Sequence, residues 1–346
     1  MKEQEKTAAR PVDTRPVRRK GRRLRWTARA RARALAWLLL VAALAVAPFV
    51  AGSYRTLLLT EILIFGLFAS SFNLLFGYTG LLSFGHAAYF AGGAYASALV
   101  MVEAGLPLPA GILAGLVGGA LLAALFGVFC VRVNEIYFSL LTLAFGMLVY
   151  TLLFQAREIT GGSDGFNLYE LGSVSVAGRE LLLGHPQVFY FVTLVTVVVG
   201  VALLHRIAWS PFGQVLRAIR ENSERVDFLG IPVRRYRYKA FVIAGAMAGL
   251  AGGLIAPFLR VAHPQMSHWT TSAEVVLGTI LGGEAFFLGP AVGIGVLIWL
   301  ESVVTGRTVY WPLVMGVILL VLVLFLPGGV VGMLARIYRR ARGSGR

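Results

Sequence analysis

Apolar runs close to 20 residues long recur along this sequence, and they constrain its fold more than any other feature. A helix of about 20 apolar residues crosses the roughly 30 Å hydrocarbon core of a bilayer, so each run is a candidate membrane span. Charged residues make up only 14% of the 346 positions, too few to give most of the chain a water-soluble surface. We predict eight spans, at 35–51, 56–76, 78–101, 108–130, 136–156, 187–204, 240–258 and 310–326.

A further apolar region, residues 272–304, is interrupted by the sequence GGEAFFLGP at 282–290. The interruption leaves two short arms, at 272–281 and 290–304. An arm of about ten residues covers roughly half of the hydrocarbon core, because a helix rises about 1.5 Å per residue. We therefore expect a re-entrant hairpin or a pair of half-helices, sheltered by the surrounding protein. The predicted fold is an all-α polytopic bundle of about eight full spans plus this element, occupying 35–335.

Basic residues set the expected orientation of the bundle. Residues 1–34 hold 13 of the 32 Lys and Arg, and we expect this basic tail to be cytoplasmic and disordered. The tail is far too long for the charged region of a signal peptide, so an uncleaved first helix is expected. If successive spans cross the membrane in alternating directions, the cytoplasmic segments hold 27 basic residues and the segments on the opposite side of the membrane hold 5. Both termini, including a basic tail at 336–346, are then cytoplasmic, and topology explains the charge without nucleic acid.

The sequence lacks the patterns that would indicate an enzyme. No G-x-x-x-x-G-K-[ST] stretch is present to cradle a phosphate, and no H-E-x-x-H helix is present to bind zinc. Cys130 is the only cysteine, which excludes an intrachain disulfide. No nucleophilic side chain and general base stand at a sequence spacing that would indicate a catalytic pair. We therefore predict neither a catalytic site nor a metal site.

The segment 206–239 is the only long basic loop between two spans. Pro211 after Ser210 favours a helix start, and Gly230 with Pro232 favours a stop. Val215, Ile219 and Val226 form an apolar stripe. The polar side of the stripe carries Arg217, Arg220, Glu221 and Glu224. An amphipathic helix over 211–230 either lies on the membrane or docks into a partner protein, and the alternative is a basic loop that only enforces topology.

Short motifs follow one another in a fixed order over residues 56–335. They are NLLFGYTG at 73–80, LSFGHAAYF at 82–90, TGGSDG at 160–165, SPFG at 210–213, RAIREN at 217–222, LGI at 229–231, AGLAGG at 248–253, LGP at 288–290 and LFLP at 324–327. Together they resemble the permease subunits of ATP-binding-cassette (ABC) importers for branched-chain amino acids. The second of these motifs contains the sequence SFGHA at 83–87. In this respect the chain is more similar to the LivM-type member of the permease pair than to the LivH-type.

The resemblance implies an importer subunit of the bacterial inner membrane with no cofactor of its own, driven by ATP that partner subunits hydrolyse. The implied partners are a LivH-type permease, two cytoplasmic ATPases, an extracytoplasmic solute-binding protein and membrane lipid. The coupling loop would be 206–239, with Arg217, Arg220, Glu221, Glu224 and Gly230 as its coupling residues. The family usually has a small, Gly-rich linker after Gly283, whereas this chain has the sequence EAFF. Permeases of ABC importers more generally have Glu-Ala-Ala, with a glycine six residues after the glutamate. Glu224 and Gly230 have that spacing in this chain, but Arg225 and Val226 replace the two alanines.

Five polar residues are candidates for the substrate pathway: Glu61, Asn73, Ser83, His86 and Glu284. A carboxylate is unfavourable in lipid, so Glu61 and Glu284 face either a polar cavity, where they contact an ammonium group, or the headgroups. The other three flank a Gly-rich break at 77–85. Broken helices expose backbone groups that bind charged substrate ends, and the alternative is a short hydrogen-bonded turn.

Two other transport functions stay open at this point. Related permeases for urea or short amides look alike in sequence, so the solute is not defined. An ion-coupled secondary carrier would need no ATPase partner, and ATP-dependent uptake separates that possibility from an ABC importer.

Overall fold

The computed structural model describes residues 20–168, 173–176, 179–182, 184–307, 310–325 and 328–343. Residues 1–46 and 47–346 form two compact units. Helix α1 runs from Lys20 to Thr79 and is interrupted at Gly52, whose φ of 74° is not helical. The prediction of a disordered tail is therefore wrong for 20–34, where arginine and alanine, both good helix formers, dominate the sequence. Residues 1–19 of that tail lie outside the described residues.

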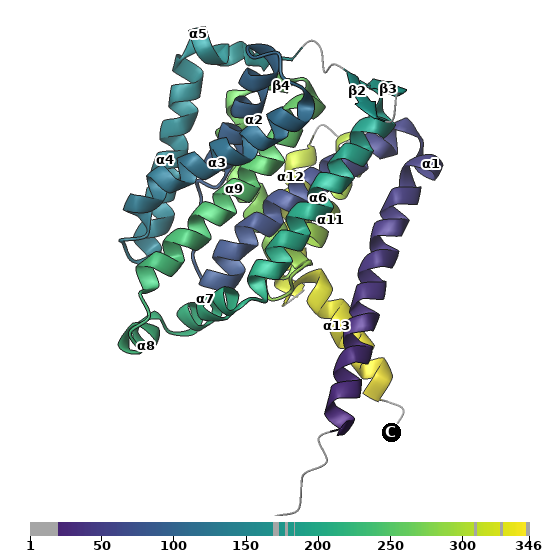
Figure 1. Ribbon diagram of the computed structural model, residues 1–346, viewed down its shortest axis with the longest axis vertical. Helices are drawn as coiled ribbons and strands as arrows, with labels where there is room; N and C mark the ends of the chain where they lie inside the picture. Colours follow the sequence, from purple (N-terminus) through teal and green to yellow (C-terminus); the bar gives the residue numbers. More distant parts are fainter. Residues whose placement is uncertain are drawn as a thin grey trace, which may run out of the picture. The chain divides into compact units, whose positions relative to one another are not determined.

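The second unit is an all-α membrane bundle, as predicted (Figure 1). After α1 its helices are α2 (Ala87–Val102), α3 (Leu108–Cys130), α4 (Glu135–Gln155), α5 (Arg157–Thr160), α6 (Pro186–Ala208), α7 (Pro211–Glu221), α8 (Ser223–Phe228), α9 (Val233–Leu259), α10 (Trp269–Gly282), α11 (Gly289–Thr305), α12 (Trp311–Phe325) and α13 (Gly329–Gly343). The second basic tail, predicted at 336–346, is helical up to Gly343.

Two short antiparallel ribbons, which the sequence analysis did not predict, accompany the helices. Strand β1 (Phe166–Asn167) pairs with β4 (Val261–Ala262), and β2 (Ser173–Val176) pairs with β3 (Arg179–Leu182). The β1–β4 ribbon joins the segment after α5 to the segment after α9. Strands of two to four residues carry too little alternation to be recognised in a sequence.

Five described helices are long and apolar enough to cross a membrane. They are Gly52–Thr79, Leu108–Cys130, Glu135–Gln155, Pro186–Ala208 and Val233–Leu259; Trp37–Val50 and Gly289–Thr305 are shorter apolar helices. The predicted span at 78–101 begins too early, because its helix, α2, starts at Ala87 and has only 16 residues. Residues 80–86 between α1 and α2 are not helical; we call them the break segment.

Glycine stripes bring α3 and α9 together along their lengths, side by side in Figure 1. A Cβ added at Gly119 would lie 2.6 Å from the Cα of Gly249, and one added at Gly115 would lie 2.7 Å from the Cα of Gly253. Such distances leave no room for a side chain, so the two backbones are in direct contact. Glycines spaced four residues apart, at 111, 115 and 119 and at 245, 249 and 253, are typical of surfaces on which membrane helices pack closely.

The interruption predicted at 282–290 is confirmed. Helix α10 ends at Gly282, α11 begins at Gly289, and the two pack against each other as a hairpin. We call the connection, residues 283–288, the hairpin tip. The arms have 14 and 17 residues, or about 21 and 26 Å of helix, which is more than the half-depth expected from the sequence.

Candidate coupling surface and substrate pathway

The predicted amphipathic helix over 211–230 consists of two helices, α7 and α8. Asn222 interrupts it with an extended backbone conformation (φ −162°, ψ 101°). The side-chain oxygen of Asn222 accepts a hydrogen bond from the Arg225 N–H at 2.8 Å and so caps α8. The expectation of one continuous helix was therefore wrong, because the asparagine offers the backbone an alternative to helix. At the other end, Ser210 caps α7 as expected, by accepting from the Gly213 N–H.

The apolar stripe of this segment packs against the start of α9. Ile219 and Val226 are buried together with Val233, and Val215 and Tyr236 cover the cluster. The stripe thus holds α7 and α8 onto the bundle.

Both predicted coupling arginines have partners within the chain. A guanidinium N–H of Arg217 donates to the carbonyl of Ala208 at 2.7 Å. The same guanidinium lies 5.4 Å from the ring centre of Tyr78 and 5.5 Å from that of Trp209, which are cation–π distances. Arg217 therefore connects α7 to the end of α1 and to the end of α6.

Arg220 connects α7 to the hairpin tip. Its guanidinium forms an ion pair with the Glu284 carboxylate at 2.6 Å and also donates to the carbonyl of Gly77. The Asn73 side-chain amide donates to the Glu284 carbonyl at 3.3 Å. The tip of the hairpin, the end of α1 and helix α7 consequently meet at one place.

Several charged and apolar side chains of the segment are exposed. Glu221 and Glu224 face outward, and Phe228 and Leu229 expose 90% and 75% of their surfaces. Gly230 ends α8 with φ of 79°, a left-handed conformation that a side chain disfavours. We call α7, α8, Leu229 and Gly230 the coupling surface. Its exposed side carries three carboxylates, those of Glu221, Glu224 and Asp227, and two large apolar side chains.

The break segment turns back from the end of α1 into the bundle. His86, at its end, lies beside Ser71, two turns before the end of α1. Helix α2 therefore starts inside the bundle, where the Ala87 N–H donates to the hydroxyl of Ser272 on α10 at 2.9 Å. Irregular backbone of this kind needs the shelter of surrounding protein at membrane depth.

His86 is fully buried in this region (0% exposed). Its Nε2 lies 3.0 Å from the Ser71 hydroxyl, and its ring stacks on Phe68 with 5.4 Å between ring centres. In the described part of the chain, Ser83 Oγ and His86 Nδ1 of the break segment are buried without a hydrogen-bond partner, and so are Asn73 Oδ1 on α1 and Thr279 Oγ1 on α10. Unpartnered polar atoms are unfavourable in an interior, so Ser83 and His86 are candidates for contact with a polar ligand.

Three carboxylates from α1, α10 and α11 form another group. Glu61 and Glu274 each interact electrostatically with Glu301, and Glu274 also interacts with Glu61. No cluster of metal-ligating side chains is found among the described residues. The predicted pathway residues therefore divide into three places: Glu61 with these carboxylates, Ser83 and His86 at the break segment, and Asn73 with Glu284 beside Arg220.

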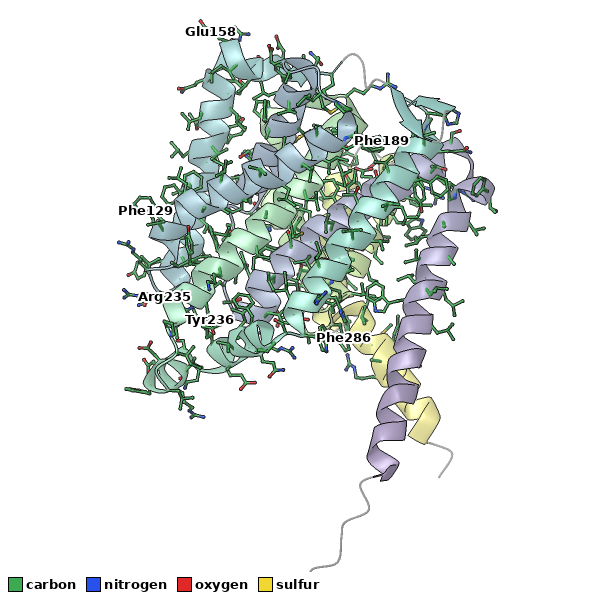
Figure 2. The ribbon with its side chains drawn as sticks, viewed as in Figure 1. Phe129, Glu158, Phe189, Arg235, Tyr236 and Phe286 are labelled. Atoms are coloured by element: carbon green, nitrogen blue, oxygen red, sulfur yellow. The ribbon has the colours of Figure 1, made fainter. Side chains whose placement is uncertain are left out.

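The bundle has two distinct ends. Arg235 and Tyr236 lie at the end that carries α7 and α8, whereas Glu158 lies at the opposite end (Figure 2). The TGGSDG motif follows Glu158, and there the Thr160 hydroxyl donates to the Leu153 carbonyl at 2.6 Å. Phe286, in the hairpin tip, lies toward the α7 end (Figure 2).

Sequence reasoning missed several of these contributors. Ser71 and Ser272 look like ordinary helix residues, and only the meeting of α1, the break segment and α10 gives them a place. Glu301 lies near the end of an apolar arm. A charged residue in such a stretch is unusual, and this could have identified Glu301 from the sequence as a candidate site residue. Phe228 and Leu229 are also visible in the sequence, but their exposure depends on the break at Asn222.

Comparison with known proteins adds independent information. A family model described as the permease component of branched-chain amino acid transport systems matches residues 54–327. The high-affinity branched-chain amino acid transport system permease protein LivM of Escherichia coli (strain K12) is 28% identical over 325 residues, which cover 86% of this chain and 75% of LivM. LivH of the same strain is 25% identical over 292 residues, covering 78% and 91%. The ribose import permease RbsC of Bacillus subtilis (strain 168) is 30% identical over 187 residues, covering 51% and 53%. No solved structure gives a significant match.

Proposed function

Since this chain belongs to the family of permease components of branched-chain amino acid transport systems, we propose that it is the membrane-spanning subunit of an ATP-driven importer for branched-chain amino acids or closely similar solutes. The coupling surface is the observation that carries the ATP-driven part of this proposal. Exposed aromatic and aliphatic side chains ringed by charges are typical of a protein-docking site.

The docking partner is a cytoplasmic ATPase subunit. Phe228 and Leu229 would insert into a groove of that subunit, and Glu221 and Glu224 would contact its polar rim. Gly230 lets the chain leave α8 in the left-handed conformation that keeps this surface accessible.

The Arg220–Glu284 ion pair provides a route for the motion of the coupling surface. When ATP binding moves the ATPases, α7 moves with them, and the ion pair transmits the movement to the hairpin tip. The tip also holds Asn73 of α1, about two turns before the break segment. A shift of α10 and α11 against α1 would open the buried polar region first to one side and then to the other, which is alternating access.

The substrate would pass the polar groups of this region. Asn73, Ser83 and His86 offer hydrogen-bonding atoms for a carboxylate or ammonium group, and the Glu61 carboxylate would attract the ammonium end. Phe68 and Phe72, which lie against the His86 ring, supply an apolar wall for a branched side chain.

We infer a topology of eight membrane crossings plus the α10–α11 hairpin, with both termini in the cytoplasm of a bacterial inner membrane. The split of basic residues, 27 on one side and 5 on the other, supports this orientation. The complete transporter would contain a LivH-type second permease, two ATPases and an extracytoplasmic solute-binding protein. ATP would be used by the ATPases alone.

Reconstitution tests the proposal. Proteoliposomes with this chain, a second permease, the ATPases and a solute-binding protein should accumulate labelled leucine, isoleucine or valine when ATP is supplied. Vesicles without the ATPases should accumulate none, whereas equal uptake with and without ATPases would identify a secondary carrier. Urea and ribose serve as comparison solutes, and preferential uptake of either would overturn the assignment of the solute.

A further inference from the structure

A cavity of about 240 Å³ lies where α1, the start of α6 and the end of α9 meet. Its walls include Leu57, Thr60, Phe189, Phe258 and Arg260. Because α7 follows the other end of α6, this cavity lies at the end of the bundle opposite the coupling surface, where Figure 2 shows Phe189. In the proposed topology this is the extracytoplasmic end.

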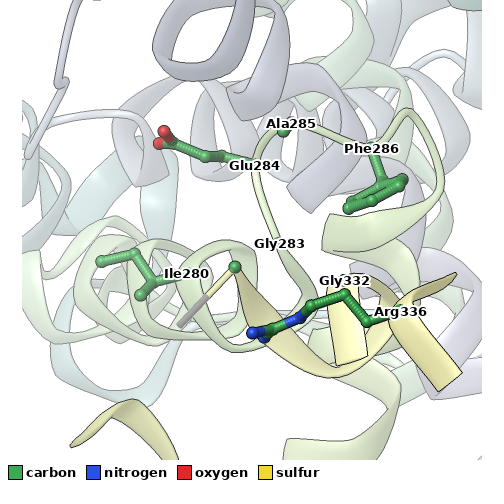
Figure 3. A pocket seen from close by; sticks show the side chains of 8 residues that line it. Ile280, Gly283, Glu284, Ala285, Phe286, Gly332 and Arg336 are labelled. Carbon is green, nitrogen blue, oxygen red and sulfur yellow. The ribbon is translucent and has the colours of Figure 1, made fainter. Parts of the chain in front are cut away.

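A larger cavity, of about 540 Å³, lies at the end that carries the coupling surface, between the hairpin tip and α13 (Figure 3). Glu284 and Phe286 of the hairpin tip line it, and the Glu284 carboxylate is paired with Arg220. This larger cavity therefore belongs to the elements already assigned to coupling. The smaller one takes part in none of the transport steps proposed above.

Arg260 supplies the positive charge of the smaller cavity. In the part of the chain that the structure describes, no hydrogen bond, ion pair or ring contact engages its exposed side chain. A Cβ added at Gly184 would lie 3.4 Å from the guanidinium Nη2, so the lack of a side chain at that position leaves the guanidinium open on one side. Arg260 is therefore available to a carboxylate, which a guanidinium can bind through two parallel N–H donors.

The backbone holds Arg260 in an unusual conformation. Arg260 ends α9 with φ of 58° and ψ of 23°, and no other described non-glycine residue has a positive φ. The β1–β4 ribbon fixes this conformation, since the Arg260 carbonyl accepts from the Leu168 N–H at 2.9 Å and Val261 pairs with Asn167. Strained residues of this kind persist only where the surrounding structure holds them, and they gather at ligand sites. The ribbon thus sets the position from which the guanidinium reaches the cavity.

The rest of the cavity suits the remainder of an apolar amino acid. The rings of Phe189 and Phe258 stack with 6.0 Å between their centres, and Leu57 adds an aliphatic wall. The Thr60 hydroxyl donates its proton to the Thr56 carbonyl at 2.8 Å, so its oxygen keeps lone pairs that can accept from an ammonium group. The cavity is smaller than the sites of drug-sized ligands, which measure about 300–1,000 Å³, and so it suits one small molecule.

We infer that this cavity is an extracytoplasmic intake site for a zwitterionic amino acid with an apolar side chain, an inference that rests on the proposed function and deepens it. The carboxylate pairs with Arg260, the ammonium group donates to Thr60, and the side chain lies against Phe189 and Phe258. The solute occupies this site before it reaches the polar groups at the break segment. Neither urea nor ribose carries a carboxylate, so the site favours an amino acid over both.

Binding of leucine to the full-length purified chain tests the site without ATP or partner subunits. Saturation-transfer NMR in phosphatidylcholine nanodiscs detects weak binding and needs no label on the protein. Two analogues separate the charged ends of the solute: 4-methylpentanoate keeps the carboxylate, and 3-methylbutylamine keeps the ammonium group. We expect the acid to displace leucine and the amine to do so at least about tenfold more weakly. Equal displacement by the two analogues would overturn the role of Arg260.

Arg260→Asn removes the guanidinium and keeps the backbone, because asparagine tolerates the left-handed conformation. Leucine affinity should fall at least about tenfold in this variant and less in Arg260→Lys. Arg307→Asn is the matched control, at another exposed arginine assigned to the same side of the membrane, and should bind leucine as wild type does. Unchanged leucine affinity in Arg260→Asn overturns the inference.

A second variant tests the cavity itself. Gly184→Leu places a side chain beside the Arg260 guanidinium and should release leucine. Gly306→Leu, at a glycine with open space around it, should not. Equal leucine affinity in these two variants would show that the solute does not occupy the cavity.

The reconstituted transporter separates this inference from the proposed function. Failure of the wild type to accumulate leucine with ATP would overturn the proposed function, and this inference with it. If the wild type accumulates leucine, the Arg260→Asn uptake rate should be at least about fivefold lower, and an equal rate overturns the inference alone. An acidic side chain of the solute-binding protein is the other possible source of a carboxylate. Normal leucine affinity with weaker docking of that protein in Arg260→Asn would assign Arg260 to the binding protein and overturn the intake site.

Discussion

The guanidinium of Arg220 and the carboxylate of Glu284 lie 2.6 Å apart, although 64 positions separate the two residues in the sequence. One belongs to α7, and the other belongs to the hairpin tip. About a third of each side chain is exposed, so the pair contributes at most about 1 kcal/mol to stability. Its main importance is therefore the connection between two elements that move in the proposed transport cycle.

Glu284→Gln should reduce ATP-driven uptake at least about fivefold, which corresponds to losing a coupling free energy of about 1 kcal/mol. ATPase binding should stay intact, because the coupling surface is unchanged. The Arg220→Glu/Glu284→Arg double variant should recover part of the uptake. Glu135→Gln is the matched control, since it removes another ion pair, with Arg237, at 3.1 Å. Equal uptake losses in the two single variants would show that the Arg220–Glu284 pair has no special role.

Gly230→Val should uncouple transport without unfolding the bundle. A β-branched residue at φ of 79° is strained by about 1–3 kcal/mol, enough to change the path of the chain after α8. The variant should insert normally and lose ATP-dependent uptake, measured in the reconstituted transporter. Gly306→Val is the control, because Gly306 has φ of −74° and open space around it. If the Gly230→Val/Glu221→Arg double variant transports normally, the segment 206–239 only fixes the membrane topology of the chain and has no coupling role.

Leu229→Ser should weaken binding of the ATPase subunits. A central apolar contact in an interface typically contributes about 2 kcal/mol, so the dissociation constant should rise roughly 30-fold. Ile136→Ser provides the comparison, since Ile136 exposes 76% of its surface at the start of α4, outside the coupling surface. Binding is measured by titrating purified ATPase onto the permease in nanodiscs. Unchanged affinity in Leu229→Ser and in Phe228→Ser would remove the basis for the docking assignment.

Cysteine labelling tests the orientation of the bundle. The only native cysteine, Cys130, is buried, and a Cys130→Ala background gives a chain without thiols. A membrane-impermeant maleimide added outside cells with a permeabilised outer membrane should label Glu158→Cys and leave Glu224→Cys unlabelled. Glu224→Cys should react only after the inner membrane is opened. The reverse pattern would invert the proposed topology.

His86→Leu should raise the KM for leucine uptake about tenfold, the effect of losing one polar contact of about 1.4 kcal/mol. A purely structural role for His86 predicts a different result: a lower Tm with an unchanged KM. Ser71→Ala is the comparison, because it removes the hydrogen bond to His86 Nε2 and leaves the imidazole in place. We expect its KM to change less than twofold.

Much of the architecture could be predicted, because the lengths of the apolar runs and the positions of glycine and proline determine where helices begin and end. The hairpin interruption at 282–290 and the caps at Ser210 and Gly230 followed from short sequence patterns. Contacts between distant segments could not be predicted in this way. The turn of the break segment toward Ser71 depends on α10, and the Arg220–Glu284 pair depends on the depth of the hairpin. Asn222 was misjudged because one side-chain hydrogen bond outweighed the helical pattern around it.

The hydrogen bond between the Ala87 N–H and Ser272 has a consequence for how the chain is made. At about 5–20 residues per second, a ribosome needs roughly 10–40 s to synthesise the 185 residues that separate the donor from the acceptor. During that time the start of α2 lacks its final partner, and the 16-residue helix is about 24 Å long, too short to span the membrane securely by itself. The insertion machinery must therefore shelter the early part of the protein until α10 emerges. Assembly of the bundle is completed from its C-terminal half, and a chain truncated before residue 272 should be a substrate for membrane quality-control proteases.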